Sequence, residues 1–269
     1  LQSEWRYHTM SKKIFFFDID GTLADQEDIL PSNQKALREL RLKGHTVMIA
    51  SGRPAGYIRR MFSGLSDGFI AANGRRIEHE GNVLLDNSFT VAELKEIIKL
   101  CRVSQCSYCL LGDGVVYHGN PLYLYGHTRP YESIDVIHVD SWDIRDVRAY
   151  AFDIIYKDAA HLKTIKQNFD GKYIINDHFD GSADVSSVSF NKGHAVAYTT
   201  SALGFSQDDS YAFGDGDNDV HMFEAAGTAV AMENATRAAK KAADYVTRHY
   251  KEDGIFHALK HLKVISCLL

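Results

Sequence analysis

The sequence has no long hydrophobic run, no basic cluster and few cysteines. A membrane-spanning helix needs about 18 consecutive apolar residues, and no stretch of these 269 residues approaches that length. The 35 acidic and 30 basic residues give a net charge of −5, which argues against a nucleic-acid groove or a site for anionic membranes. We therefore expect a cytoplasmic protein, monomeric or weakly dimeric, whose partner is a small molecule.

Targeting signals and cysteine motifs are also missing. Leu1 to Met10 lacks the apolar segment of a signal peptide, and we expect the natural chain to start at Met10, with the preceding nine residues as an extension. Cys106 and Cys109 have the spacing of redox or zinc motifs, but no second pair completes a tetrahedral site. We expect the four cysteines to be ordinary thiols.

The sequence does contain an apolar strand that ends in two carboxylates. Residues Lys13 to Phe17 predict a buried strand, and Asp18 and Asp20 follow it directly. Two ionised carboxylates ~5 Å apart repel by roughly 3 kcal/mol at an effective dielectric near 20, so such a pair usually binds a cation or holds a proton. Taken alone, residues 18–21, Asp-Ile-Asp-Gly, are explained equally well by an ordinary Asp-Gly turn at the end of a strand. A metal site is the first interpretation to test against the rest of the chain.

The order of strands and helices predicts an α/β fold with a second domain inserted into it. Residues 11–80 and 188–265 alternate strands with helices, which is typical of a doubly wound, Rossmann-like parallel sheet. Residues 81–187 instead combine many short strands with two helices, one of which starts with a capping box at Thr90 and Glu93. We expect these residues to form an inserted α+β domain with a largely antiparallel sheet.

Polar residues follow the ends of several predicted strands of the parallel sheet. Besides the first pair, they are Ser51 and Gly52, Lys192, and the acidic loop Asp215, Asn218 and Asp219. The carboxyl ends of parallel strands share one edge, so these groups can converge. Carboxylates, a hydroxyl, an amide and a lysine suit Mg²⁺ together with a phosphate group. A calcium loop starting at Asp215 is excluded, because Val220 and Ala226 occupy the positions that need glycine and glutamate.

The segments FDIDGT, ASGR, NKG and GDGDND, in this order, resemble the four motifs of the haloacid dehalogenase-like (HAD) phosphohydrolases. The position of the insertion, between the second and third motifs, resembles the Cof-like branch, which dephosphorylates sugar phosphates and related metabolites. The resemblance implies a Mg²⁺-dependent phosphoric monoester hydrolase that forms an aspartyl-phosphate. It implies the following roles: Asp18 as nucleophile and metal ligand, Asp20 as acid/base and carbonyl ligand, Asp215 as third ligand, and Ile19, Ser51, Gly52, Lys192 and Asn218 as phosphate contacts.

Several residues and functions stay open at this level. We expect Asp219 and Thr22 to orient other site residues, and Asp217 to cap the following helix. Two alternatives to a phosphatase remain: a phosphomutase or phosphotransferase with the same intermediate, and a non-catalytic binding protein on the HAD scaffold. Further candidates are Arg53, Asn73 and Arg75 at the rim, and Asp113, Tyr117, Asn176 and His178 in the inserted domain as contacts for the leaving group.

Overall fold

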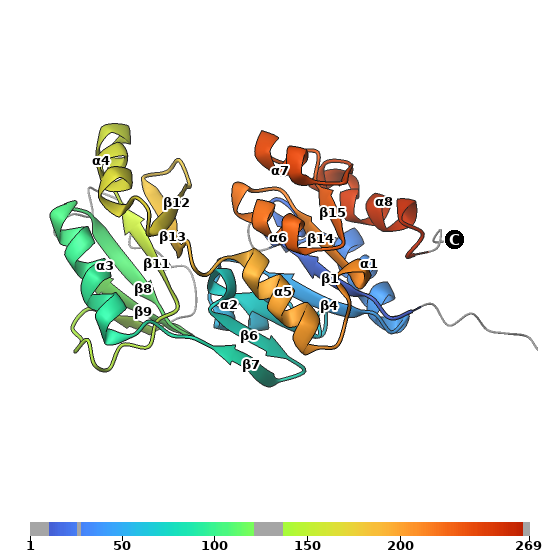
Figure 1. The fold of residues 1–269 in the computed structure, drawn as a ribbon, viewed down its shortest axis with the longest axis horizontal. Coiled ribbons are helices and arrows are strands. Elements are labelled where there is room, and N and C mark those ends of the chain that lie inside the picture. Colours follow the sequence, from blue (N-terminus) through green and yellow to red (C-terminus); the bar gives the residue numbers. More distant parts are fainter. Residues whose placement is uncertain (1–10, 26–27, 121–136, 266–269) are drawn as a thin grey trace, which may run out of the picture.

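The computed structural model describes residues 11–25, 28–120 and 137–265. The chain forms two main sheets, which lie toward opposite ends of the molecule in Figure 1. Within the described segments, every helix is too short or too polar to span a bilayer.

The larger sheet has eight strands in the order β16-β15-β14-β1-β4-β5-β6-β7. The first six run parallel and the last two are antiparallel, which confirms the predicted doubly wound sheet. The strands are β1 (Ile14–Phe17), β4 (Thr46–Ala50), β5 (Gly68–Ala71), β6 (Arg76–His79), β7 (Asn82–Asp86), β14 (Ser210–Gly214), β15 (Thr228–Ala231) and β16 (Tyr245–Val246).

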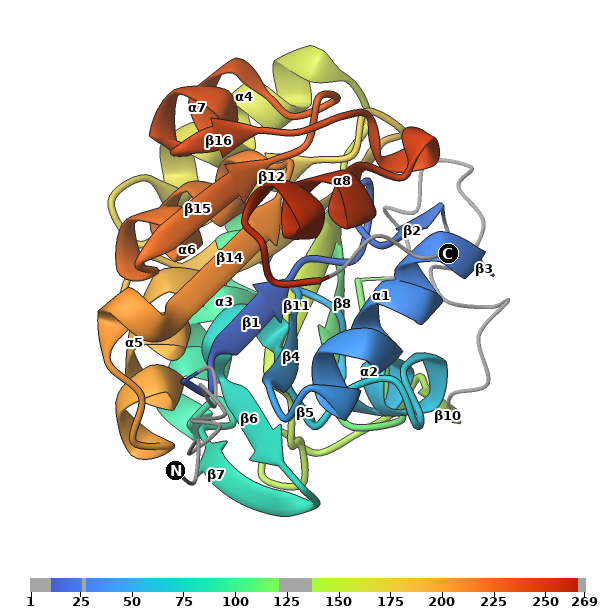
Figure 2. The same cartoon turned by 90° about the vertical axis from the view of Figure 1, so that its right-hand side faces the viewer.

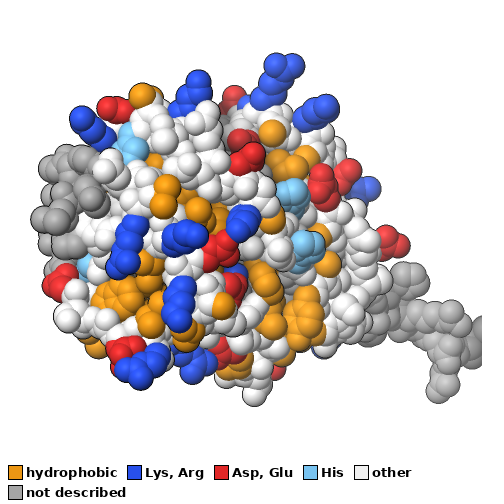
Figure 3. Space-filling model, turned by 60° about the vertical axis from the view of Figure 1, so that its left-hand side comes forward, with side chains coloured by type: hydrophobic (Ala, Val, Ile, Leu, Met, Phe, Trp, Pro, Cys, Tyr) orange, Lys and Arg blue, Asp and Glu red, His pale blue; other side chains and the backbone are white. Residues whose placement is uncertain are grey.

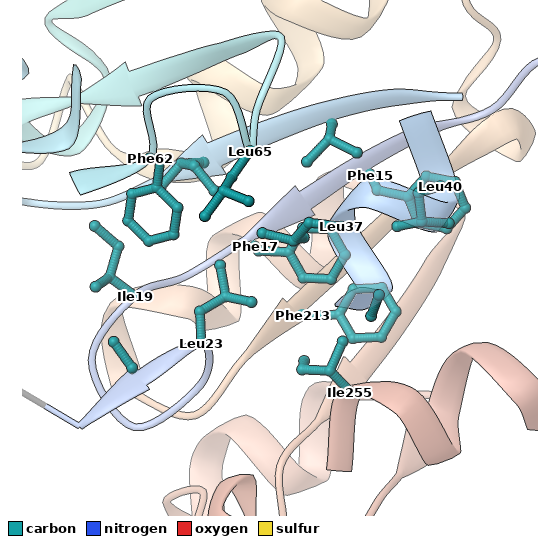
Figure 4. Packing of buried hydrophobic residues seen from close by; sticks show 14 of the residues in the cluster. Phe15, Phe17, Ile19, Leu23, Leu37, Leu40, Phe62, Leu65, Phe213 and Ile255 are labelled. Atoms are coloured by element: carbon teal, nitrogen blue, oxygen red, sulfur yellow. The ribbon is translucent and has the colours of Figure 1, made fainter. Parts of the chain in front are cut away.

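Helices cover both faces of this sheet, as Figure 2 shows. Side chains alternate along β1, so Phe15 and Phe17 pack in one apolar layer (Figure 4) and Ile14 and Phe16 in the other. Burial of each of these side chains contributes about 1.5–3 kcal/mol. The first layer includes α1 (Pro31–Leu42), α2 (Ala55–Met61) and α8 (Gly254–His261); the second includes α5 (Lys192–Ala202), α6 (Val220–Ala225) and α7 (Arg237–Ala242).

Short elements lie between these strands and helices along the chain. The described single-turn 3-10 helices and the small hairpin are η1 (Ala72–Gly74), η3 (Gln207–Asp209), η4 (Asp217–Asp219), η5 (Tyr250–Glu252), β2 (Ala24–Asp25) and β3 (Asp28–Ile29).

The second sheet has six strands in the order β10-β9-β8-β11-β13-β12. All pairs are antiparallel except β9 with β10, in agreement with the expected sheet type. One face of the sheet packs against α3 and α4 in its own apolar cluster. The elements are α3 (Val91–Val103), β8 (Ser107–Leu111), β9 (Val115–Gly119), β10 (Ile137–Val139), β11 (Ala151–Ile155), α4 (Ala159–Phe169), β12 (Tyr173–Asp177) and β13 (Ser182–Ser187).

The structure corrects the predicted start of the insertion at residue 81. Strand β7 pairs with β6 in the larger sheet, and Leu84 and Leu85 pack against the apolar layer that contains Ile77. The hairpin of β6 and β7 therefore extends the larger sheet, and we use "insertion" for residues 87–187. Cys101, Cys106 and Cys109 are buried and not joined by a disulfide in the described part of the chain, and Cys267 lies outside the described residues.

Arg75 contacts both chain segments that connect the insertion to the larger sheet. Its guanidinium carbon lies 4.1 Å from the ring centre of Phe89, in the first connection, and 4.8 Å from that of Phe190, in the second. Its Nη2 donates a hydrogen bond of 2.8 Å to Glu93, at the start of α3. The side chain is 5% exposed. A planar cation between two rings thus fixes the two connections relative to each other.

Replacing Arg75 with alanine is expected to lower the free energy of unfolding by about 2–4 kcal/mol, because the change removes both ring contacts and leaves Glu93 without its cation. Urea denaturation followed by circular dichroism measures the effect. Arg145→Ala is the matched control, since Arg145 is 79% exposed and pairs with nearby Asp143; a loss below about 1 kcal/mol is expected there. Equal losses in the two variants would contradict the role of Arg75.

Candidate active site

The structure brings the predicted polar residues together at one edge of the larger sheet. Asp18 follows β1, Ser51 follows β4 and Asp215 follows β14, and all three strands run in the same direction. Lys192 is the first residue of α5, whose start is capped by the Asn191 side chain. Residues separated by up to about two hundred positions in the chain therefore meet because parallel strands end at a common edge.

Lys192 lies at the centre of this group. Its Nζ donates hydrogen bonds to Asp18 at 2.5 Å and to Asp219 at 2.7 Å, and its side chain is fully buried. Burial alone would lower the pKa of the Lys192 ammonium, but the charges of Asp18 and Asp219 raise it above its usual value. Lys192 therefore stays charged and holds Asp18 in a fixed orientation.

Three carboxylates face this single cation. Oxygen atoms of Asp18, Asp215 and Asp219 lie within 4.8 Å of one another. Burial, and next the charge of Asp219, raises the pKa of Asp18 well above its usual value and that of Asp215 to about 7. Excess negative charge on hard oxygen ligands is the arrangement that binds a divalent cation such as Mg²⁺. The donor set thus fits a metal ion in which Asp18 and Asp215 supply the carboxylates.

Asp215 is positioned by neighbours from two other loops, one after β1 and one after β15. Thr22 Oγ1 donates to its Oδ1 at 3.2 Å, and Asn234 Nδ2 donates to its Oδ2 at 3.1 Å. Gly21 has a φ of +74°, and a Cβ atom there would lie 2.4 Å from Asp215 Oδ2. Glycine is required at this position for both reasons. Asn234 was not predicted as a site residue. It lies shortly after β15, and a polar residue after a strand is the same signal that identified Asp18, Ser51 and Asp215.

Asp219 is fully buried and contacts three donors. One oxygen accepts from Lys192, and the other accepts from the backbone N–H groups of Asp215 and Gly216 at 2.9 and 3.0 Å. These contacts support the orienting role expected for it. We predicted that Asp217 caps the following helix, but α6 has no side-chain cap. The Asp217 carboxylate instead accepts a hydrogen bond of 2.6 Å from Thr236, which links η4 to the start of α7.

Asp20 and Arg53 form a pair at the entrance of the site. Arg53 donates from Nε and Nη2 to the two carboxylate oxygens of Asp20 at 2.9 and 2.8 Å, and its guanidinium stacks on the Tyr57 ring. The Asp20 side chain is 48% exposed. Arg53 is thus a direct partner of an expected acid/base group. The backbone carbonyl of Ile19 accepts hydrogen bonds from the N–H groups of Thr22, Leu23 and Ala24, which close the turn that contains Asp20 and Gly21.

A cavity of about 510 Å³ opens over these residues and extends to the insertion. Its walls come from both units. The lining residues are Asp18, Asp20, Ser51, Gly52, Arg53, Asp215, Gly216 and Asn218 on the side of the larger sheet, and Asp153, His178, Asp180, Ser182 and Asp184 on the insertion.

Of the four residues expected to contact a leaving group, the structure places two near this space. His178 lines the cavity, and Asn176 lines a smaller adjoining recess that also includes Asn218. Asp113 instead pairs with Arg59, and Tyr117 packs against Trp142 in the apolar cluster of the insertion. Asn73, a rim candidate, lines the recess, whereas Arg75 joins the two connections.

The carboxylates of the insertion that line the cavity were not predicted from the sequence. Asp153 lies in the middle of the apolar strand β11, and Asp184 pairs with it in register on β13. On β13, Ser182 and Asp184 alternate with the buried Ala183 and Val185. This alternation was a usable signal, because one face of the strand had to be polar. Which polar surface this face contacts could not be read from the strand itself.

Comparisons with known proteins agree with this geometry. The family model described as haloacid dehalogenase-like hydrolase matches residues 15–259. A Bacillus subtilis protein named "Putative phosphatase YkrA" is 31% identical over 265 residues, which cover 96% of this chain and all of the relative. The B. subtilis 5-amino-6-(5-phospho-D-ribitylamino)uracil phosphatase YcsE is 29% identical, with 93% and 95% of the two chains covered.

A solved structure shows the same fold. The HAD subclass IIB sugar phosphatase BT4131 is 26% identical and superposes with a TM-score of 0.78, covering 94% of this chain and 100% of its own.

Proposed function

This chain is a phosphatase of the haloacid dehalogenase-like hydrolase family, in its Cof-like branch, and we propose that it hydrolyses phosphomonoesters of small metabolites with Mg²⁺ through an aspartyl-phosphate. The observation that carries the proposal is the buried contact between Lys192 and Asp18 at the base of a cavity. One carboxylate is thereby aimed and charge-compensated, while two further carboxylates lie beside it.

Asp18 is the nucleophile of the proposed reaction. Its carboxylate oxygen attacks phosphorus and the ester oxygen leaves, so one difficult displacement becomes the formation and the hydrolysis of an acyl phosphate. Lys192 offsets the repulsion between Asp18 and the anionic phosphate, and Asp219 keeps the ammonium in place. Ser51, Gly52, Asn218 and the backbone of Ile19 are proposed to hold the phosphate oxygens.

Asp20 is the proposed acid and base. It protonates the departing oxygen in the first step and takes a proton from the attacking water in the second. Arg53 holds this carboxylate at the edge of the cavity with one hydrogen bond to each oxygen, and each oxygen keeps an acceptor site for the substrate or water.

Mg²⁺ bound by Asp18, Asp215 and the carbonyl of Asp20 would supply electrostatic stabilisation of the charge on the transferring phosphoryl group. Asp215 can hold the ion only as a carboxylate, and Thr22 and Asn234 keep its two oxygens in a fixed orientation.

The relatives suggest substrates of modest size. The names of YcsE and BT4131 refer to a phosphorylated ribityl compound and to sugar phosphates, respectively. We propose that the substrate of this chain is a sugar phosphate or a similar small phosphomonoester. We also propose that the protein is cytoplasmic and is a monomer or a weak dimer. Release of inorganic phosphate from such compounds with Mg²⁺ tests the proposal. Recovery of the phosphate on a second hydroxyl compound would identify a phosphotransferase instead.

Metal binding is expected to depend on pH because protons and the cation compete for Asp215, whose pKa is raised to about 7. In EDTA, Asp215 has a pKa of about 7 in the native state and its usual value of 3.8 in the unfolded chain. Between these two values the native state binds more protons than the unfolded chain. The free energy of unfolding should therefore fall as the pH rises from about 4 to about 7, by an amount on the order of 1–4 kcal/mol. Excess Mg²⁺ should reverse that loss.

Melting temperatures from about pH 5 to pH 8, with EDTA or with MgCl₂, measure this linkage. The stabilisation by Mg²⁺ should grow with pH and should largely disappear in Asp215→Asn. Asp170→Asn, an exposed change at the end of α4, is the control. An equal Mg²⁺ effect at both ends of the pH range, or full phosphatase activity after dialysis against EDTA, would contradict the proposed metal site.

A further inference from the structure

A second pocket, of about 640 Å³, lies on the α3 side of the insertion. Among the described residues, it shares none with the cavity over Asp18. On β11, Phe152 and Ile154 pack in the apolar cluster with α3 and α4, so the alternating Asp153 faces the other way, into the cavity. Tyr108, which lines the second pocket, belongs to the α3 side. The two spaces therefore lie on opposite faces of the sheet of the insertion.

Three basic side chains of α3 line this second pocket: Lys95, Lys99 and Arg102. They are too widely spaced to form a basic run in the sequence, but the helix places them on one face. At 1.5 Å per residue, the row extends over about 10 Å. Within the described part of the chain, none of the three side chains makes an ion pair or a hydrogen bond. The row is therefore available to a bound anion.

Nearby carboxylates do not neutralise this row. Glu96, on the same helix, pairs with Lys172, and Asp143 pairs with Arg145. Asp140 is the one carboxylate among the described residues that line the pocket. Three cations and one carboxylate give the pocket a net positive charge, which attracts anions.

Tyr108 adds a buried hydrogen-bond donor to the lining. The residue is 4% exposed, and its hydroxyl makes no hydrogen bond to the residues that the structure describes. Its ring lies across Gly119, where a Cβ atom would come within 2.4 Å of the hydroxyl oxygen. Burial raises the pKa of Tyr108 to about 12, so the hydroxyl stays protonated. This phenol can therefore donate to an oxygen of a ligand in the pocket.

Trp142 gives the pocket an aromatic surface. Its Nε1 donates to the backbone carbonyl of His118 at 3.0 Å, and its ring packs edge-on against Tyr117, so the orientation of the indole is fixed. Ile98 and Ile144 also line the pocket. A half-buried indole in a fixed orientation can stack with a planar ring. Figure 3 shows Lys and Arg side chains beside hydrophobic surface on this side of the molecule.

We propose that this pocket binds a nucleotide with two or more phosphates, with the phosphates along the α3 row and the base on Trp142. Lysine, arginine and a protonated phenol donate strong hydrogen bonds to phosphate oxygens. A sugar phosphate would leave the apolar part of the lining uncovered, and a fatty-acid anion would need only one of the three cations. The site is separate from the catalytic one, and the proposal does not depend on phosphatase activity.

Titration of the protein with ADP in EDTA tests the proposal, because EDTA keeps the proposed catalytic metal site empty. The chain has two tryptophans, Trp5 and Trp142, and stacking of the base on Trp142 should quench fluorescence. A Kd of about 1 mM or tighter is expected, and Trp142→Phe should abolish the quenching. Pyrophosphate and adenosine, measured by calorimetry, should each bind at least about tenfold more weakly, since each retains only one half of the contacts.

Variants of the lining locate the bound ADP. Lys95→Gln combined with Lys99→Gln should weaken ADP binding by about tenfold or more, and Tyr108→Phe should weaken it by about threefold or more. Lys163→Gln combined with Lys166→Gln removes the same charge from exposed positions of α4, outside the pocket, and should keep the wild-type affinity. Melting curves confirm that each variant is folded.

Three results would overturn the proposal: no binding of ADP, binding of pyrophosphate as tight as that of ADP, or a loss in the pocket variants no larger than in the α4 variant. Binding of ADP that requires Mg²⁺ would place the nucleotide at the proposed catalytic metal site and would overturn the proposal as well. None of these results would affect the proposed phosphatase activity, which is measured by phosphate release.

Discussion

Asp18→Asn is expected to reduce phosphate release by at least about a thousandfold while the protein stays folded. The amide cannot form the acyl phosphate, and loss of a covalent nucleophile costs several kcal/mol of transition-state stabilisation. Stability should be unchanged or slightly higher, because burial and Asp219 already make the charged form of Asp18 unfavourable and raise its pKa. Lys192 retains Asp219 as its partner in the variant.

Phosphate release with Mg²⁺ and a melting curve measure the two effects in the same preparation. Asp208→Asn is the matched control, because Asp208 is an exposed carboxylate in η3. This 3-10 helix precedes β14, whereas Asp215 and the other site residues follow the strands. Its turnover should equal that of the wild type. Turnover of Asp18→Asn within tenfold of the wild type, in a folded protein, would remove Asp18 from the role of nucleophile.

Lys192→Met is expected to impair stability and activity together. The change leaves Asp18 and Asp219 buried without their cation, and breaking a buried pair in this way costs about 3–5 kcal/mol. Asp18 can avoid part of that cost by binding a proton. The stability loss should therefore increase as the pH rises, since a carboxyl group with a raised pKa stabilises the fold only while it is protonated.

Urea denaturation at two pH values and phosphate release measure the effects of Lys192→Met. In Lys192→Met combined with Asp219→Asn, part of the stability should return because one buried charge is removed, whereas activity should not. Lys172→Met is the control: Lys172 is 58% exposed and pairs with Glu96 at the surface, so a change below about 1 kcal/mol is expected. A Lys192→Met loss no larger than that of Lys172→Met would contradict the central role of this lysine.

Most of the core elements could be predicted because each is specified by its own residues. The apolar run before Asp18 forms β1, and Thr90 and Glu93 form the capping box that starts α3. Each signal is local: a short apolar segment bounded by turn residues, or a side chain that caps the nearest free N–H groups. The convergence of Asp18, Ser51, Lys192 and Asp215 also followed, because the order of elements implies parallel strands with a common edge.

The errors arose where a residue's partner lies far away in the chain. Strand β7 was assigned to the insertion because its sequence resembles the strands that follow, yet its pairing with β6 places it in the larger sheet. Asp217 was expected to cap its own helix, but the structure brings Thr236 close enough to bind it instead. Asp113 and Tyr117 were plausible by their turn and strand positions, and their actual partners are Arg59 and Trp142.

The sequence by itself determined the family of the fold, the strand ends that carry the proposed catalytic groups and the chemistry that those groups can perform. These properties depend on residue type, spacing and element order, all of which are read along the chain. The tertiary structure alone decided which face of the insertion meets Asp18, that Arg53 binds Asp20, and that Asp153, Asp180 and Asp184 form the far wall of the cavity. These contacts depend on how the sheet of the insertion packs over the edge of the larger sheet. A local pattern of residues does not specify this packing, because the two surfaces are formed by segments that lie far apart in the chain.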